Sequence, residues 1–175
     1  VQQGVEMYLH FQEPVTPVSD NDVHRQPGQV LAVWGPQGAP GRTLTAIAVA
    51  RILATQGKRV CLMDVDTVAP ALTMLTGVVE DASGIVVASR YAQRGSLTQQ
   101  SLMQLARPIA SGCWLIGGIS HPDRWEELDS RTLDDVLAVA VTTFDHVVVD
   151  VGFGVAASEA SGNLLDVPRF RAATQ

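Results

Sequence analysis

The stretch GPQGAPGRT, residues 35–43, places glycines, an arginine and a threonine hydroxyl between the apolar runs QVLAVW and LTAIAVARILA. Glycines let successive backbone N–H groups wrap around a phosphate, and the amino terminus of a following helix attracts negative charge. Phosphate-binding loops of the form G-x4-G-K-[ST] add a lysine that reaches the terminal phosphates and a hydroxyl that binds Mg²⁺. The stretch therefore has the composition of such a loop but lacks the lysine.

The strict spacing of that motif fails in both registers of the stretch. A loop that ends in the triplet GRT requires glycine at position 36, where the chain has Pro36. A loop that begins at Gly35 requires glycine at position 40, where the chain has Pro40. The stretch alone is weak evidence, so its neighbours in the fold must decide whether it binds phosphate.

Aspartates close two apolar runs further along the chain. Asp64 and Asp66 end LMDVD, spaced for the same face of an extended segment, and Asp150 ends HVVVD. Carboxylate and hydroxyl oxygens are the ligands that Mg²⁺ prefers. The alternative to a functional role is that Asp64 and Asp66 are only strand-end or capping residues, and that Arg42 is only a partner of a surface carboxylate. Together with the glycine-rich loop, these residues favour a site.

The elements that must position these residues follow from the hydrophobic pattern. Short apolar runs bounded by turn residues predict buried strands in QVLAVWG, RVCLMD, GCWLIGG and HVVVD. Helices are expected over 44–54, 69–76 and 84–93, after an N-cap at Thr98, and from an N-cap at Ser130, where Asp134 and Asp135 face water. Strands that alternate with helices predict a doubly wound, mostly parallel α/β sheet, whose ligands bind at the carboxyl ends of the strands.

The overall composition fits one globular domain. The chain has 175 residues, of which 46% are hydrophobic and 17% charged, and its net charge of −6 argues against a protein that coats nucleic acid. Cys61 and Cys113 lie in apolar runs, which predicts buried thiols in a reducing compartment, the cytoplasm. Residues 1–28 are expected to be a disordered leader or linker, 29–175 the domain, and 155–175 a loop or tail.

The order of these parts resembles the deviant Walker-A P-loop ATPases of the MinD/ParA group, and within it the MinD-like and CpaE/TadZ-like branch. The segment QGAPGRT takes the place of the family's K-G-G-x-G-K-[ST] loop, GKRVCLMDVD resembles its second strand and TFDHVVVDVG its Walker-B strand. The resemblance covers about 30–154. Because the family continues with further strands, the resemblance implies either a P-loop NTPase domain truncated at its carboxyl end or a minimal form of that domain.

The resemblance also implies roles for individual residues. The phosphates of ATP would be surrounded by the loop and the start of its helix, namely Gln37, Gly38, Ala39, Pro40, Gly41, Arg42, Thr43 and Leu44. Thr43, Asp64 and Asp150 would hold Mg²⁺, Asp66 would orient or deprotonate the attacking water, and Arg42 would replace the Walker lysine. A nucleotide-bound homodimer and a protein partner in septum, chromosome, pilus or secretion positioning are implied. Nothing in the sequence indicates nucleic-acid or membrane binding.

Departures from the family loop predict a weakened site. Gln37 stands where a lysine reaches across to the partner subunit's nucleotide, and Arg42 offers a planar fork instead of a compact ammonium. Pro40 removes an N–H group, and Ala39 replaces a glycine. We expect weak nucleotide binding and slow or absent hydrolysis, because a lost transition-state cation costs several kcal/mol.

Alternative functions and minor features remain open at this stage. One alternative to an ATPase is a catalytically inactive pseudo-ATPase scaffold. Another is a relative of the bacterial tyrosine kinases, which usually carry a tyrosine-rich tail, whereas the only tyrosines here are Tyr8 and Tyr91. Gly152 and Gly154 either admit a γ-phosphate or form a turn. The segment HPDRWEEL either borders the site or packs Trp125 under a loop.

Overall fold

The structure is a computed structural model that describes residues 26–36, 40–79 and 82–152. Its sheet has the order β1-β5-β2-β4-β3, formed by β1 (Gln29–Val33), β2 (Val60–Asp64), β3 (Arg107–Ala110), β4 (Cys113–Ile116) and β5 (His146–Asp150). Neighbouring strands are parallel except for the pair β3–β4. The predicted α/β class with a mostly parallel sheet is confirmed.

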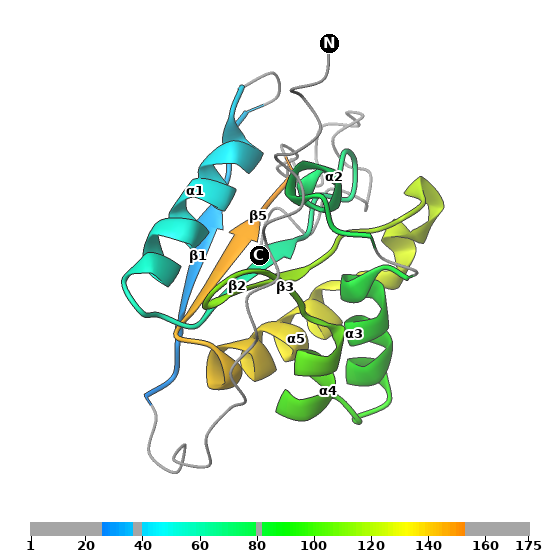
Figure 1. The fold of residues 1–175 in the computed structure, drawn as a ribbon. Helices are drawn as coiled ribbons and strands as arrows, with labels where there is room; N and C mark the ends of the chain where they lie inside the picture. Colours follow the sequence, from blue (N-terminus) through cyan, green and yellow to red (C-terminus); the bar gives the residue numbers. More distant parts are fainter. Residues whose placement is uncertain (1–25, 37–39, 80–81, 153–175) are drawn as a thin grey trace.

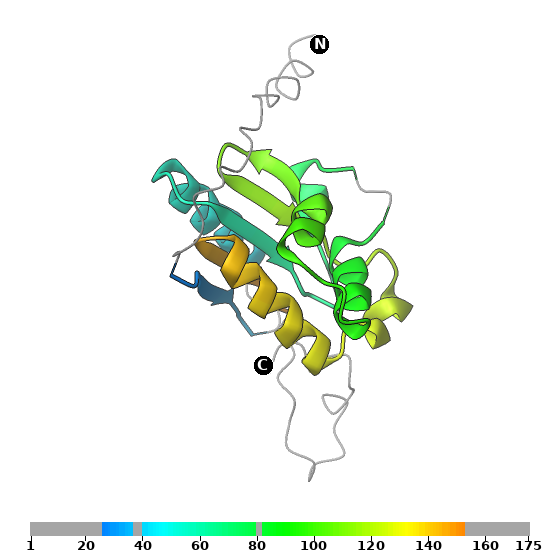
Figure 2. The same cartoon turned by 90° about the horizontal axis from the view of Figure 1, so that it is seen from below.

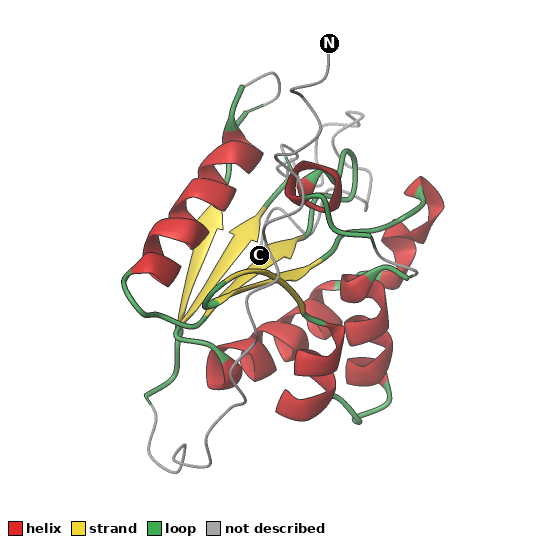
Figure 3. Cartoon of the chain, in the orientation of Figure 1, coloured by secondary structure: helices red, strands yellow, loops and turns green. Residues whose placement is uncertain are grey.

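Helices cover both faces of this sheet (Figures 1 and 3). They are α1 (Arg42–Thr55), α2 (Leu72–Thr76), α3 (Gly84–Gln93), α4 (Gln99–Leu105), the 3₁₀ helix η2 (Pro122–Glu127) and α5 (Ser130–Thr143). Helix α1 lies on one face, whereas α3, α4 and α5 pack together on the other, as the view from below also shows (Figure 2). Among the described residues, no helix has the length and apolar character needed to span a membrane.

Strand β2 lies in the middle of the sheet and supplies both halves of the core. Val60 and Leu62 point to the face of α1, and Cys61 and Met63 point to the face of α3 and α5. All four side chains are fully buried. The continuous apolar run of this strand thus follows from burial on both faces, as its sequence predicts.

Helix α1 packs through a stripe of alanines. Ala46, Ala50 and Ala54 repeat at intervals of four residues and are buried against the sheet. Leu44 and Ile52 lie outside this stripe and are 59% and 57% exposed. The predicted helix is present, but it buries one narrow face although its sequence is apolar nearly all round.

The prediction that β1 is a buried strand is wrong. Val30 and Leu31 are 44% and 36% exposed, and no residue of the strand is buried. The reason is its position at the edge of the sheet, where β5 is its sole partner among the described strands. An apolar run reports that a strand avoids water on average, but it does not report how many neighbours the strand has.

Three local features differ from the sequence prediction. Strand β3 was not expected, because Pro108 and its short exposed run argue against a strand; it forms an antiparallel edge beside β4, where proline is tolerated. The N-cap of α5 is Asp129, whose carboxylate accepts from the Thr132 N–H at 2.9 Å, and not Ser130. The segment HPDRWEEL, expected to be a loop, contains the helix η2, whereas the expectation that Trp125 is packed is confirmed, because Trp125 packs against the core.

Other expected features are present. Thr98 caps α4 in a capping box with Ser101, and Asp134 and Asp135 on α5 are exposed.

Gly28 already belongs to the folded domain and not to the expected leader over 1–28, because its N–H donates to the Val141 carbonyl and an added Cβ would lie 2.1 Å from the Phe144 oxygen. The expected leader over 1–25 and tail over 155–175 lie outside the described residues.

The two cysteines are free and buried on opposite faces of the sheet, as the core clusters of Cys61 and Cys113 show. Burial raises the pKa of the Cys61 thiol above the usual range, and it raises the pKa of Cys113 to about 11 against the opposing charge of Arg51. We expect neither thiol to react with a water-soluble disulfide reagent at about pH 8, because thiolate is the reactive species. Unfolding in urea should expose both thiols and let them react with the reagent. Rapid labelling of either thiol in the folded protein would contradict this burial.

Candidate functional site

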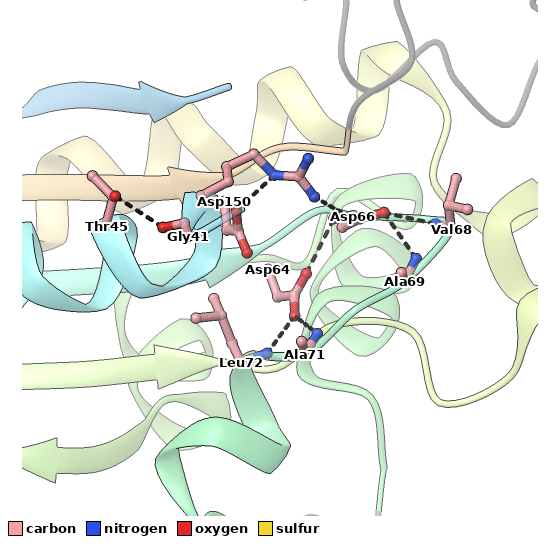
Figure 4. A network of polar contacts seen from close by, with 10 residues as sticks. Gly41, Thr45, Asp64, Asp66, Val68, Ala69, Ala71, Leu72 and Asp150 are labelled. Atoms are coloured by element: carbon pink, nitrogen blue, oxygen red, sulfur yellow. Dashed lines mark hydrogen bonds and ion pairs between the residues drawn. The ribbon is translucent and has the colours of Figure 1, made fainter. Parts of the chain in front are cut away.

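The sheet topology gathers the predicted site residues at one edge. Val33 at the end of β1 and Asp64 at the end of β2 both align with Asp150 at the end of β5. Helix α1 starts at the same edge, after the segment that follows β1, and Gly41 at its start lies near Asp150 and Asp66 (Figure 4). Residues distant in sequence therefore meet where parallel strands end, as expected for ligand sites in such sheets.

The amino terminus of α1 is built on a glycine. Gly41 is its N-cap and has φ 87° and ψ 2°, a left-handed conformation that other L-residues rarely adopt. No side chain caps the helix, and no acidic residue lies in its first turn. Pro40 is exposed, and Gln37, Gly38 and Ala39 lie outside the described residues. The first-turn N–H groups thus meet no competing carboxylate, which suits an anion.

Arg42 forms a buried ion pair with two of the predicted acids. Its Nη2 donates to Asp66 Oδ2 at 2.7 Å, and its Nε lies 3.4 Å from Asp150 Oδ1. The Arg42 side chain is 14% exposed, and each carboxylate is 1% exposed. This contact unites the helix start with the ends of β2 and β5.

Both oxygens of Asp66 already have partners. Oδ1 accepts from the backbone N–H groups of Val68 at 2.8 Å and Ala69 at 3.0 Å, while Oδ2 accepts from Arg42. A carboxylate has about four acceptor sites, and these three bonds occupy most of them. Asp66 lies where the sequence places it, but in this arrangement most of its acceptor sites already face protein donors.

Asp64 faces the opposite way from the ion pair. Its Oδ2 accepts from the N–H groups of Ala71 and Leu72, both at 3.1 Å, and its Oδ1 accepts from the N–H of Asp66 at 3.1 Å. Figure 4 shows this carboxylate directed at the start of α2. Burial raises its pKa to about 7 although these N–H groups favour the charged form. Asp64 therefore holds the turn between β2 and α2.

Asp150 is the acid with unused hydrogen-bonding capacity. Both of its oxygens and the Arg42 Nε are buried without a hydrogen bond of good geometry, and they make up three of the five such side-chain atoms among the described residues. Burial raises the pKa of Asp150, while the Thr43 hydroxyl and the Arg42 charge oppose the rise. Buried polar atoms without a hydrogen bond are uncommon, and two of these three, Arg42 Nε and Asp150 Oδ1, face each other at 3.4 Å.

The predicted magnesium ligands, Thr43, Asp64 and Asp150, do not form a ready metal site in this arrangement. Within the described part of the chain, the bonds that Asp64 accepts come from backbone N–H groups, and the guanidinium of Arg42 borders Asp150. The described part of the chain contains no group of three or more His, Cys, Asp or Glu residues that could hold a metal ion. With Arg42 in place, the residues do not fit Mg²⁺ as the sequence suggests.

The sequence model of one protein family, the CobQ/CobB/MinD/ParA nucleotide-binding domain, matches residues 31–156 of this chain. The chain belongs to this family. That assignment confirms the resemblance seen in the sequence. It also fits the sheet topology, which brings Asp64 and Asp150 together at the carboxyl ends of their strands. No curated protein sequence matches the chain.

Solved structures share the fold of this MinD/ParA-family domain. The septum site-determining protein MinD of Pyrococcus horikoshii OT3, complexed with Mg-ADP, has a TM-score of 0.60 and 16% identity over 83% of this chain. A ParA family ATPase from Chlorobium tepidum TLS has a TM-score of 0.64 and 19% identity over 73% of this chain. The kinase domain of the Escherichia coli tyrosine kinase ETK has a TM-score of 0.57 and 20% identity over 81% of this chain. The matches span 53%, 52% and 51% of those chains, so the present chain covers about half of each.

Two glycines give the acids of this MinD/ParA-family domain their positions. A Cβ on Gly152 would lie 2.9 Å from Asp66 Oδ1, and a Cβ on Gly118 would lie 2.9 Å from Asp64 Cγ. Gly152 thus provides space for Asp66, a role beyond the two considered from the sequence, and Gly154 lies outside the described residues. Gly118 was missed; the signal was the pair of glycines that closes the run GCWLIGG.

We expect the substitution Gly152→Ala to lower the free energy of unfolding by about 1–3 kcal/mol, because the added methyl group displaces the buried Asp66 carboxylate. Urea denaturation measures the change. The same substitution in an Asp66→Ala background should cost less, since the colliding carboxylate is absent. Equal costs in the two backgrounds would show that Gly152 does not position Asp66.

Proposed function

We propose that this chain binds ATP as a MinD/ParA-like switch that acts in the spatial positioning of a septum, a chromosome or a pilus or secretion apparatus, with weak or slow hydrolysis. The observation that carries the proposal is the buried contact of Arg42 with Asp66 and Asp150 at the start of α1. A cation and a glycine-initiated helix start meet there, and both favour the negative charge of a polyphosphate.

Phosphate binding is assigned to the helix start and Arg42. Gly41 opens α1 without a capping side chain, so the first-turn N–H groups and the helix dipole favour an anion there. The guanidinium belongs to the first residue of the helix and has a fork of donors that matches phosphate oxygens. The Pyrococcus horikoshii MinD structure, complexed with Mg-ADP, supports a nucleotide as the ligand.

Slow turnover is assigned to the state of Asp66. Both of its oxygens accept hydrogen bonds, and one of the donors is Arg42, the same cation that is assigned to the phosphates. Activation of water by Asp66 would first require loss of one of these buried, charge-assisted bonds. The competition between catalysis and an existing ion pair favours binding over hydrolysis.

The switch is proposed to work as a homodimer in the cytoplasm, joined at the face that carries the site. Trp34 and Leu44 flank the glycine-rich segment and are 50% and 59% exposed. Large apolar side chains on a surface favour a partner, and these lie directly beside the residues assigned to nucleotide. The buried free thiols support a reducing compartment. The positioning or secretion partner is part of the same proposal.

A pseudo-ATPase scaffold is the second candidate. The observation in its favour is again the Arg42 ion pair, because it neutralises acid charge without any ligand. In that case the fold recruits a partner, and the site is retained for stability.

Binding of Mg-ATP and release of phosphate, measured for the wild type and Asp66→Asn, test these candidates. The control is Asp135→Asn, which removes an exposed acid on α5. The switch predicts ATP binding by the wild type and a slow phosphate release that Asp66→Asn lowers further while the control does not. Equal release from all three proteins would remove the ATPase activity, and failure of the folded wild type to bind ATP would leave the scaffold.

A further inference from the structure

We infer that Arg42 is the resident cation of the acidic site: its guanidinium takes the place of a divalent metal ion beside Asp66 and Asp150, so the domain binds nucleotide without needing Mg²⁺. The nucleotide half of this inference rests on the proposed function, whereas the cation half concerns the protein alone. The contacts of 2.7 Å to Asp66 and 3.4 Å to Asp150 carry it.

The site needs a positive charge even without a ligand. Asp64, Asp66 and Asp150 are at most 2% exposed. Asp64 and Asp150 are register partners at the ends of neighbouring strands, and Asp66 lies two residues after Asp64, so the carboxylates repel one another at short range. Buried like charges of this kind are stable only when a cation or a proton compensates them. Arg42 is the cation that contacts Asp66 and Asp150, and a guanidinium keeps its charge at any physiological pH.

The position of this cation is fixed by the fold. Arg42 is the first residue of α1, and the left-handed Gly41 before it sets the direction from which the side chain enters the site. The Arg42 side chain is 14% exposed, so most of it is enclosed by protein. A tethered guanidinium is always present at the site, whereas a metal ion must arrive from solution and would be repelled by it. The side chain therefore has the advantage over a free divalent ion.

The remaining oxygens are too few for a metal ion as long as Arg42 stays. Asp64 accepts from three backbone N–H groups, and Asp66 accepts from Val68, Ala69 and Arg42. Asp150 is left with oxygens that lack a hydrogen bond and with the Thr43 hydroxyl nearby. A guanidinium has donors enough to face Asp66, Asp150 and a phosphate together. The same geometry that excludes a metal ion thus leaves Arg42 able to face nucleotide.

Uptake of Mn²⁺ by the nucleotide-free protein, followed through the electron paramagnetic resonance signal of the free ion, tests the cation half. We expect Arg42→Gln to bind Mn²⁺ at least about tenfold more tightly than the wild type. The melting temperature of Arg42→Gln should rise with added Mn²⁺, while that of the wild type stays constant. The double variant Arg42→Gln/Asp150→Asn should lose the gain. Equal Mn²⁺ affinity of wild type and Arg42→Gln would overturn the inference.

Binding of ATP to the wild type with Mg²⁺ and with EDTA tests the nucleotide half and requires no variant. We expect the two dissociation constants to agree within about twofold, and tightening by Mg²⁺ of about tenfold or more would overturn metal independence. If ATP binds in neither condition, the proposed function fails, yet the Mn²⁺ titration still decides whether Arg42 replaces a metal ion. If Arg42→Gln does not fold without a metal ion but folds with Mn²⁺, the inference is supported. If it folds with neither, Arg42→Lys takes its place. Because lysine keeps a cation at the site, Arg42→Lys should bind Mn²⁺ no more tightly than the wild type, and binding about tenfold tighter would overturn the inference.

Discussion

Replacing Arg42 with alanine should lower the free energy of unfolding by about 3–5 kcal/mol, the usual cost of removing one partner of a buried ion pair. Asp66 and Asp150 would be left 1% exposed and without their cation. Urea denaturation followed by circular dichroism measures the loss. The control is Arg131→Ala on α5, an exposed arginine whose removal should change stability by no more than about 0.5 kcal/mol.

A second variant separates the contribution of the positive charge of Arg42 from that of its planar set of guanidinium donors. Arg42→Lys keeps a cation but not the planar donors that face Asp66 and Asp150 from different atoms, so its stability should fall between those of the wild type and Arg42→Ala. In a double-mutant cycle, Arg42→Ala and Asp66→Asn should be coupled, because each removes the same bond of 2.7 Å. If Arg42→Ala matches the stability of the wild type, the ion pair contributes nothing to the folded state.

Replacing Asp64 with alanine should cost about 3 kcal/mol or more, since each buried donor left without an acceptor costs about 1–3 kcal/mol. The donors concerned are the N–H groups of Asp66, Ala71 and Leu72. Urea denaturation reports the total loss. Hydrogen exchange at Ala71 and Leu72 should accelerate more than exchange in β5, because the start of α2 loses its acceptor.

The matched variant is Asp64→Asn, which keeps one oxygen as an acceptor and should be less destabilising than Asp64→Ala. The exposed Asp135→Ala serves as the neutral control. If Asp64 were solely a metal ligand, Asp64→Ala would leave the stability of the metal-free protein unchanged. That outcome would remove the structural role that its hydrogen bonds indicate.

Local patterns in the sequence were sufficient for most of the helices and strands, though not for β3 or η2, and for the edge where the site lies. The apolar runs of β2 and β5, the spacing on α5 and the cap at Thr98 are properties of neighbouring residues, so they can be predicted without the fold. Parallel strands place their carboxyl ends together, which is why Arg42, Asp66 and Asp150 could be grouped in advance. The MinD/ParA-type order of motifs gave the family.

Tertiary structure decided the partner of each side chain. Asp64 and Asp66 differ by two positions, yet one carboxylate bonds to the start of α2 and the other to Arg42. The sequence could not show this, because the direction of a side chain after a strand ends depends on how the following turn folds back toward it. Likewise, β1 reads as buried from its own residues, and its exposure follows from the strand order. Periodicity is a local property, whereas hydrogen-bond partners and neighbouring strands are set by the packing of the whole domain.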